Sequence, residues 1–246
     1  MAISSNIRVM TYNVHRCCGR DGKTSPERIA GIIKEYNAGI VALQELDVNQ
    51  QRTSFVDQPK EIAKILGMHY HFFPSFQPEQ GGLYGNAILS SYPMQVKKTE
   101  NLPAIKTLSL EPRSAIWVNI QAGEHSLNFV TTHLGLKGKE RVLQIKELLG
   151  ENWLESSECQ GPVIFCGDFN VGTYSKVYRM VGKQLADVQK QGFRPQATLT
   201  SRFPFFRVDH IFVTEHFIVN EIVVPRTILT KAASDHLPLI TSITLC

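Results

Sequence analysis

Short runs of apolar residues, several of them alternating with polar residues, recur along the whole chain. Such runs, bounded by Gly, Pro, Asn, Asp or Ser, are typical of β-strands. We therefore expect strands at residues 7–13, 40–45, 84–89, 115–120, 127–132, 163–166, 208–213, 217–224 and 239–245.

Three other segments repeat their apolar residues every three or four positions, which is the period of an amphipathic helix. The first follows Ser25, which can cap the helix, and Pro26, which suits its first turn. Its apolar face is formed by Ile29, Ile32, Ile33 and Tyr36. The same period predicts helices at residues 61–66 and 139–149. Many strands with few helices indicate an α/β protein in which helices cover sheets.

The chain has 246 residues, of which 43% are hydrophobic and 20% charged, as in an ordinary globular protein that buries a large core. No stretch rich in Pro, Gly or Ser divides it, so we expect residues 1–246 to form a single domain. The net charge of +4 tolerates a phosphorylated or polyanionic substrate. Lys and Arg are scattered, however, as is usual for a solvated surface.

The five cysteines are an odd number and contain no C-x-x-C pair, which favours a reducing compartment over a disulfide-bonded secreted protein. The first ten residues do not resemble a signal peptide, and no apolar run approaches the ~18 residues that cross a bilayer. We therefore expect a cytoplasmic monomer without a transmembrane segment.

Polar residues gather at or near the ends of the predicted strands, where side chains from several strands can build a site. They are Asn13, Glu45, His133, Asp168, Asn170, Asp209, Asp235 and His236. Each alone has an ordinary explanation, such as a turn, a surface carboxylate or a hydrogen-bonded core histidine. Together they form an oxygen-rich set without the Cys and His spacing of a zinc site, which favours Mg²⁺, with Mn²⁺ as a substitute. The Gly-rich phosphate loops of nucleoside-triphosphate and dinucleotide enzymes are absent.

Seven segments, in this order, resemble the motifs of the endonuclease/exonuclease/phosphatase superfamily, the deoxyribonuclease I-like, metal-dependent phosphoesterases. They are Thr11-Tyr12-Asn13-Val14-His15, Gln44-Glu45, Gly85-Asn86-Ala87-Ile88-Leu89-Ser90, Thr132-His133-Leu134, Gly167-Asp168-Phe169-Asn170, Arg207-Val208-Asp209-His210-Ile211-Phe212 and Ser234-Asp235-His236-Leu237-Pro238. They span nearly the whole chain. The resemblance implies a four-layered α/β sandwich, in which two packed, mainly antiparallel sheets are flanked by helices and the site lies at one end.

The resemblance also implies a metal site beside an activated water. Glu45 would be the central metal ligand, with Asn13 and Asp235 near the same cation or its waters. Asp168 would accept a proton from the attacking water or orient it, and Asn170 would hold that water or a phosphate oxygen.

A second group of residues would bind the phosphate, again by resemblance. His236 would act as a charged donor, with Asp209 fixing its tautomer and stabilising its positive form. His133 and Arg113 fall where the family places phosphate-contacting groups, and Asn86 falls in a segment expected to bind substrate. A phosphate diester is anionic and repels hydroxide, so catalysis needs this charge neutralisation, a positioned water and help for the leaving oxygen.

The shared motifs prescribe the chemistry and leave the substrate open. We expect a phosphodiester in DNA or RNA, and the alternative is a phospholipid or a small phosphorylated metabolite. A non-catalytic binding protein on the same fold is a further alternative, against which the complete set of site residues argues. One residue departs from the family pattern: His210 stands where many members have a tyrosine, and we assign it no role.

Two loops, 72–82 and 193–206, are candidates for substrate contact. The second brings together Arg194, Arg202, Phe203, Phe205 and Phe206. Arginine with aromatic residues can stack on nucleobases. The simpler interpretation is that these phenylalanines complete the core.

Overall fold

Twelve β-strands form two six-stranded sheets within the part of the chain that the computed structural model describes, residues 6–79, 81–107, 109, 111–192 and 194–246. The first sheet has the order β11 (Phe217–Val223), β12 (Leu239–Leu245), β1 (Asn6–Asn13), β2 (Ile40–Val48), β4 (Leu83–Ser90) and β3 (His69–Phe76). The second has the order β5 (Met94–Asn101), β6 (Ser114–Ala122), β7 (His125–His133), β8 (Val163–Asp168), β10 (Asp209–Val213) and β9 (Ala186–Asp187).

Each sheet has a parallel pair of strands at its centre, β1 with β2 and β7 with β8, and its other neighbouring strands are antiparallel. The expectation of mainly antiparallel sheets is therefore confirmed. Two parallel neighbours run toward the same edge of a sheet, so their final residues can lie close together. In the second sheet these ends are His133 and Asp168, which are direct cross-strand partners.

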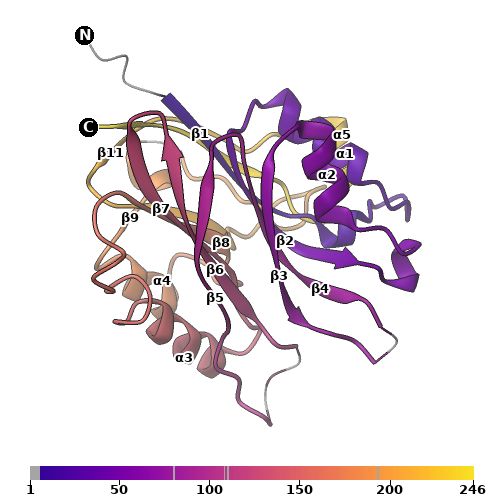
Figure 1. Cartoon of the computed structure of the whole chain (residues 1–246), viewed down its shortest axis with the longest axis horizontal. Helices are drawn as coiled ribbons and strands as arrows, with labels where there is room; N and C mark the ends of the chain where they lie inside the picture. Colours follow the sequence, from indigo (N-terminus) through magenta and orange to yellow (C-terminus); the bar gives the residue numbers. More distant parts are fainter. Residues whose placement is uncertain (1–5, 80, 108, 110, 193) are drawn as a thin grey trace.

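Five helices cover the outer faces of the two sheets (Figure 1). The first sheet is covered by α1 (Pro26–Glu35), α2 (Gln58–Leu66) and α5 (Ile228–Ala233), and the second by α3 (Gly138–Leu148) and α4 (Lys176–Val181). Three buried clusters lie between these four layers. Along β1, for example, Ile7 and Val9 face the other sheet while Met10 and Tyr12 face the helices. The expected four-layered α/β sandwich is therefore the observed fold.

The helix starts follow from their capping residues. The Ser25 hydroxyl accepts a hydrogen bond from the Arg28 amide at 3.1 Å, so α1 begins where the sequence predicted. The second helix begins at Gln58, three residues before the predicted start at Glu61, because Asp57 caps it. The third helix, Gly138–Leu148, is one residue out of step with the predicted range.

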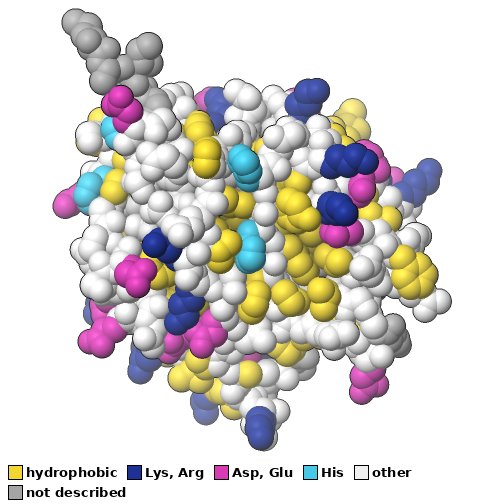
Figure 2. Space-filling model, in the orientation of Figure 1, with side chains coloured by type: hydrophobic (Ala, Val, Ile, Leu, Met, Phe, Trp, Pro, Cys, Tyr) yellow, Lys and Arg dark blue, Asp and Glu magenta, His cyan; other side chains and the backbone are white. Residues whose placement is uncertain are grey.

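Three strands that the sequence analysis did not predict, β3, β5 and the two-residue β9, lie at the edges of the sheets. Most residues of β3 and β5 are exposed or half-buried, so these two sequences lack an apolar core-facing pattern. The range 72–82 was expected to be a loop, and this was wrong for residues 72–76, which belong to β3. Figure 2 shows hydrophobic side chains gathered over β3 and α2, and Lys and Arg scattered among acidic residues on the same face.

Candidate active site

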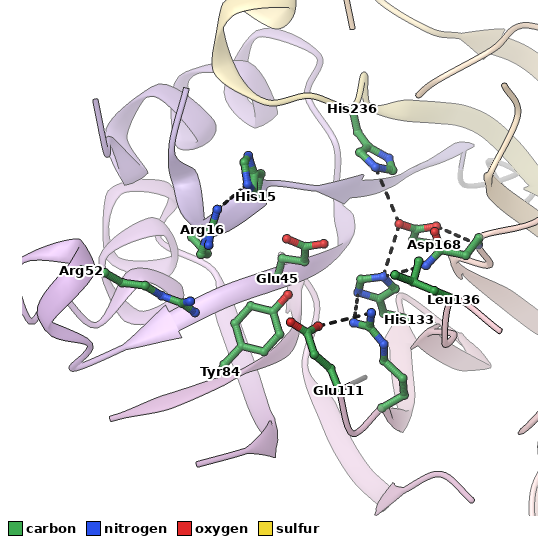
Figure 3. Close-up of a pocket in the computed structure, with 12 residues that line it drawn as sticks. His15, Arg16, Glu45, Arg52, Tyr84, Glu111, His133, Leu136, Asp168 and His236 are labelled. Atoms are coloured by element: carbon green, nitrogen blue, oxygen red, sulfur yellow. Dashed lines mark hydrogen bonds and ion pairs between the residues drawn. The ribbon is translucent and has the colours of Figure 1, made fainter. Parts of the chain in front are cut away.

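A recess of about 300 Å³ opens at the end of the sandwich where both central strand pairs end. Its walls come from both sheets and from the loops that follow β1, β7 and β8 (Figure 3). Three predicted site residues, Asn13, His133 and Asp168, are the last residues of their strands. The Asn13 amide nitrogen bonds the Asp168 carboxylate at 3.0 Å and so joins the two sheets at this point.

Glu45 reaches the recess through a break in the regular structure of β2. The register of β2 against β4 shifts between Leu43 and Leu46, and Glu45 has a left-handed backbone with φ of 63°. A β-bulge of this kind redirects a side chain, and non-glycine residues adopt such φ values at a cost that tertiary contacts must offset. One such contact is the hydrogen bond from the Asn13 amide to Glu45 Oε1, 2.9 Å long.

Asp168 occupies the centre of the site and is almost completely buried. Its Oδ2 accepts from the Asn13 amide, and lies 3.5 Å from His133 Nε2 and 3.8 Å from His236 Nε2. Its Oδ1 accepts from the Asn170 backbone amide at 2.9 Å. Burial and the neighbouring Asp209 carboxylate raise the pKa of Asp168 to about 7, which suits a group that takes up a proton near neutral pH.

The buried His133 is held as a neutral imidazole. Arg113 can only donate, so His133 Nδ1, 3.1 Å from the guanidinium, must accept, and the single ring proton is on Nε2. Burial, Arg113 and His236 together hold the pKa of His133 well below its ordinary value. The Asn170 side-chain nitrogen donates to the Leu134 carbonyl at 2.9 Å and lies 3.0 Å from His133 Nε2. The acceptor that faces the Nε2 proton of the neutral His133 is therefore Asp168 Oδ2, 3.5 Å away.

His236, in contrast to the neutral His133, is positively charged. Its Nδ1 donates to Asp209 Oδ2 at 2.8 Å, and both side chains are buried. Burial alone would lower the pKa of His236, but the charge and hydrogen bond of Asp209, with smaller contributions from Asp168 and Asp235, raise it to about 10. The imidazolium can therefore offer its Nε2 proton to an anion at neutral pH.

The segment before β12 is tied to the end of β1 through Ser234. The Ser234 hydroxyl donates to the Asn13 carbonyl at 2.8 Å and accepts from the His236 amide at 3.2 Å. This arrangement places Asp235, whose side chain is about half exposed, beside the Asn13 strand end. His15 Nδ1 lies 3.8 Å from the Asp235 carboxylate.

Carboxylate and amide oxygens from Glu45, Asn13 and Asp235 are the hard donors that Mg²⁺ prefers, and Mg²⁺ needs only one or two carboxylates. Among the described residues Glu45 has a single hydrogen-bond donor, Asn13, so its carboxylate has free acceptor capacity. The donor set therefore fits the ion. A bound Mg²⁺ would polarise a phosphate oxygen and neutralise its charge.

A second group of metal-ligating residue types, Asp168, Asp209 and His236, has its ligand atoms within 4.8 Å of one another. In this group the protonated His236 already donates to Asp209, and an imidazolium has no lone pair for a metal. We therefore interpret this group as a hydrogen-bonded ion pair.

Two residues near the site act behind the recess wall. The Asn86 amide donates to the Ser114 hydroxyl at 3.3 Å, across the gap between the sheets and next to Arg113, so the structure does not bring Asn86 to the recess surface. His210 is buried against Phe169, with its Nε2 2.9 Å from the Val171 carbonyl. It thereby packs against the segment that carries Asp168.

The recess also has walls that the sequence analysis missed. They are His15, Arg16, Arg52, Tyr84, Glu111 and Leu136. His15 is the last residue of a recognised motif and Arg16 directly follows it, which was a usable signal. The others lie in segments whose position depends on tertiary packing.

The sequence matches the model of the Endonuclease/Exonuclease/phosphatase family over residues 10–236. The chain therefore belongs to this family, as its motifs predicted, and its members are phosphoesterases. No curated protein matches the sequence. Within the described residues, no helix combines the length and apolar character needed to cross a membrane.

Solved structures share the fold over almost the whole chain. An endonuclease/exonuclease/phosphatase from Beutenbergia cavernae is 21% identical, with 98% of this chain and 72% of that chain covered and a TM-score of 0.75. The human Nocturnin catalytic domain with bound sulfate is 24% identical, with coverage of 98% and 94% and a TM-score of 0.75. A mannosyl-6-phosphatase from Bacteroides thetaiotaomicron is 20% identical, with coverage of 97% and 100% and a TM-score of 0.75. Likeness at this level establishes the fold and leaves the substrate open.

Proposed function

We propose that this protein is a Mg²⁺-dependent hydrolase that cleaves a phosphodiester in nucleic acid, with Mn²⁺ as a substitute ion. The observation that carries the proposal is the position of Asp168 Oδ2 between the neutral His133 and the charged His236. This places a proton acceptor between two proton donors, which is what attack of a water on an anionic phosphate needs.

The roles follow from the charge states. Asp168, with its raised pKa, takes a proton from the water, and Asn170 helps to hold that water or a phosphate oxygen. His236 donates to a phosphate oxygen while Asp209 maintains its charge. His133 would donate to the leaving oxygen, and Glu45, with Asn13 and Asp235, would hold the cation. These assignments are proposals that the mutants described below test.

The position of the Arg113 guanidinium is fixed by contacts with two other side chains. Its guanidinium is nearly buried, contacts His133 and lies 3.3 Å from the Glu111 carboxylate. The cross-sheet bond from Asn86 to Ser114 supports the backbone next to it. We therefore propose that Arg113 contacts the phosphate and that Asn86 acts as a positioning residue, one step away from the substrate.

A nucleic-acid substrate is supported by the loop that precedes β10. Phe203, Phe205 and Phe206 are 63%, 76% and 60% exposed, so the interpretation that they complete the core is wrong. The Arg202 guanidinium lies over the Phe203 ring. Aromatic rings exposed beside an arginine can stack on bases. Phe193, which belongs to the same predicted loop, lies outside the described residues.

This loop is fastened directly to the catalytic segment. The Ser201 amide donates to the Asp235 carbonyl at 2.8 Å, and Leu199 forms a β-bridge with His236. The exposed phenylalanines are therefore carried by a segment whose other contacts fix the two site residues. A single strand of DNA or RNA whose phosphate is bound at Asp168 would extend toward this loop, where a base can stack on an exposed phenylalanine ring.

The direct test is hydrolysis of bis(p-nitrophenyl) phosphate with Mg²⁺ and with EDTA, followed by single-stranded and duplex DNA and RNA. Phe205→Ala should weaken binding of a single-stranded oligonucleotide about tenfold without lowering the melting temperature. Ile218→Ala, which removes a side chain 55% exposed on β11, is the matched control. No turnover with any substrate would leave the non-catalytic binding protein as the better interpretation.

The second candidate substrate is a small phosphorylated metabolite, which the limited size of the recess favours. Phosphomonoesters and phospholipids therefore belong in the same panel. Faster Mg²⁺-dependent hydrolysis of a sugar phosphate or a phospholipid than of any oligonucleotide would replace the nucleic-acid assignment.

We also propose that the protein acts as a monomer in the cytoplasm, which size-exclusion chromatography and cell fractionation can test.

A further inference from the structure

One end of the recess has no role in the proposed reaction. Arg16, Arg52 and Tyr84 line it on the far side of Glu45 from His236 (Figure 3). Two guanidinium groups and a phenol facing the same space are all hydrogen-bond donors. This end of the recess is therefore suited to an anion.

Arg16 is held at the recess by a strained turn. His15, Arg16 and Cys17 all have positive φ, at 46°, 59° and 54°. The side-chain amide of Gln58 donates to the Arg16 carbonyl at 2.6 Å, and Gln58 is fully buried. Three successive residues in this conformation persist only when their surroundings enforce it, and such strain is characteristic of functional sites.

Arg52 is held by a fully buried carboxylate. Its Nε and Nη2 donate to the two oxygens of Asp47 at 2.8 and 2.7 Å, so Nη1 remains available. The guanidinium lies over the Tyr84 ring at 5.5 Å from its centre, and the side chain is 44% exposed. Asp47 therefore fixes the orientation of Arg52 while leaving one edge of it open to the recess.

The same buried unit positions both arginines. Gln58, which bonds the Arg16 carbonyl, also accepts a hydrogen bond from the Asp47 amide at 2.9 Å. Arg16 and Arg52 are thus connected through one hydrogen-bonded network, although 36 positions separate them in the sequence. Such preorganisation reduces the entropy that binding must otherwise overcome.

The charges at this end leave Arg16 free for a ligand. Asp47 neutralises Arg52, and Glu111 lies against Arg113. Among the described residues Arg16 forms no ion pair with a carboxylate, and its guanidinium contacts the ring of His15. Burial and the nearby Glu45 carboxylate raise the pKa of Tyr84, so its hydroxyl remains a donor at neutral pH.

We propose that Arg16, Arg52 and Tyr84 form a second anion-binding subsite, which takes a phosphate group of the substrate other than the one that is hydrolysed. The inference rests on the proposed function and narrows it: the substrate carries two phosphate groups close together. Arginine is well suited to this because its planar donors match phosphate oxygens. The second phosphate belongs either to the same nucleotide or to the next nucleotide of a strand.

The test is calorimetric binding in EDTA, where hydrolysis does not occur, of thymidine 3′,5′-bisphosphate and of the two thymidine monophosphates. We expect the parent protein to bind the bisphosphate at least about tenfold more tightly than the better monophosphate, as charge-assisted hydrogen bonds of this kind allow. Arg16→Gln should remove most of this advantage while leaving the affinity for the better monophosphate nearly unchanged.

Two further variants and a control complete the design. Arg52→Gln leaves the buried Asp47 carboxylate without a charged partner and can unfold the protein. Arg52→Lys is therefore tested beside it, because lysine keeps the positive charge but cannot form the paired hydrogen bonds of a guanidinium. Tyr84→Phe removes only the hydroxyl. Arg20→Gln makes the same charge change at an exposed position outside the recess and should keep the full bisphosphate advantage.

Equal affinity of the parent protein for the bisphosphate and the better monophosphate would overturn the inference, as would an equal loss in Arg20→Gln. The proposed function fails by a different result, the absence of Mg²⁺-dependent turnover in the parent. Adding the dinucleotide pTpT identifies the source of the second phosphate. An Arg16-dependent gain for pTpT indicates a strand, and a gain for the bisphosphate alone indicates a small nucleotide.

Discussion

Nδ1 of His236 lies 2.8 Å from Oδ2 of Asp209, and the two side chains are 7% and 0% exposed. Because this pair is shielded from water, the carboxylate has a large effect on the protonation of the imidazole. The pKa of His236 is raised to about 10, against an ordinary value of about 6.5. The imidazole of His236 is therefore expected to carry a positive charge at neutral pH.

The first prediction concerns this pair and pH. In Asp209→Asn the pKa of His236 should fall toward its ordinary value of about 6.5, because burial is then opposed only by the smaller contributions of Asp168 and Asp235. NMR titration of the imidazole in the metal-free protein measures this directly. The exposed Asp21→Asn serves as the control. An imidazole that stays protonated above pH 8 in Asp209→Asn would mean that another group supplies the charge.

The same pair links stability to pH. Since the folded-state pKa of His236 is above the unfolded one, its contribution to stability is fully present below pH about 6.5 and is lost as the pH rises toward about 10. Urea unfolding of the parent between pH 6 and 10 should show this decline, and Asp209→Asn should flatten it.

The activity losses of Asp209→Asn and His236→Ala should be non-additive in the double mutant, because one charged contact cannot be lost twice.

A second prediction separates Asp168 from that pair. Asp168→Asn keeps the shape of the side chain but removes the proton acceptor, so kcat should fall by about 10² to 10⁴ while substrate affinity changes little. Steady-state kinetics with bis(p-nitrophenyl) phosphate gives both quantities. A variant that loses affinity but keeps kcat would show that Asp168 binds substrate and does not act on water.

The third prediction concerns the metal. Glu45→Gln should weaken Mg²⁺ binding at least about tenfold in a calorimetric titration, because a charged hard ligand is replaced by a neutral amide. The melting temperature of the metal-free protein should not fall, since Glu45 is only partly buried and lies on a strained bulge. Glu124→Gln, at an exposed turn, is the matched control. Unchanged Mg²⁺ affinity in Glu45→Gln would remove Glu45 from the metal site.

The fourth prediction concerns the backbone beneath Asp168. Gly167 has φ of 143°, and a Cβ there would lie 1.9 Å from the Thr132 carbonyl oxygen on β7. Gly167→Ala should therefore destabilise the protein by more than about 2 kcal/mol in urea unfolding. Gly172→Ala, a few residues further along, meets nothing within 4 Å and should have little effect. Similar stability of the two variants would mean that β7 and β8 can separate without cost.

The sequence alone determined much of the fold and most of the chemistry. Alternating apolar positions predicted strands such as β1 and β7 because burial on one or both faces of a sheet leaves a local pattern. Motif order then identified the family, and with it the sandwich. It also singled out Asn13, His133 and Asp168, which prove to be the last residues of their strands. These features could be predicted because they depend on residues close together in the chain.

The tertiary structure alone decided how the recess is completed. The edge strands β3 and β5 bury too little to show a pattern, and nothing local indicates that Glu45 lies on a bulge or that Asn86 lies behind the recess wall. Gln58 reaches the Arg16 carbonyl across 42 positions of sequence, and through Asp47 it aligns Arg52 with the same space. Contacts of this kind form only when distant segments pack against one another. The sequence around one residue does not indicate which distant residue it will contact, so these contacts could not be predicted.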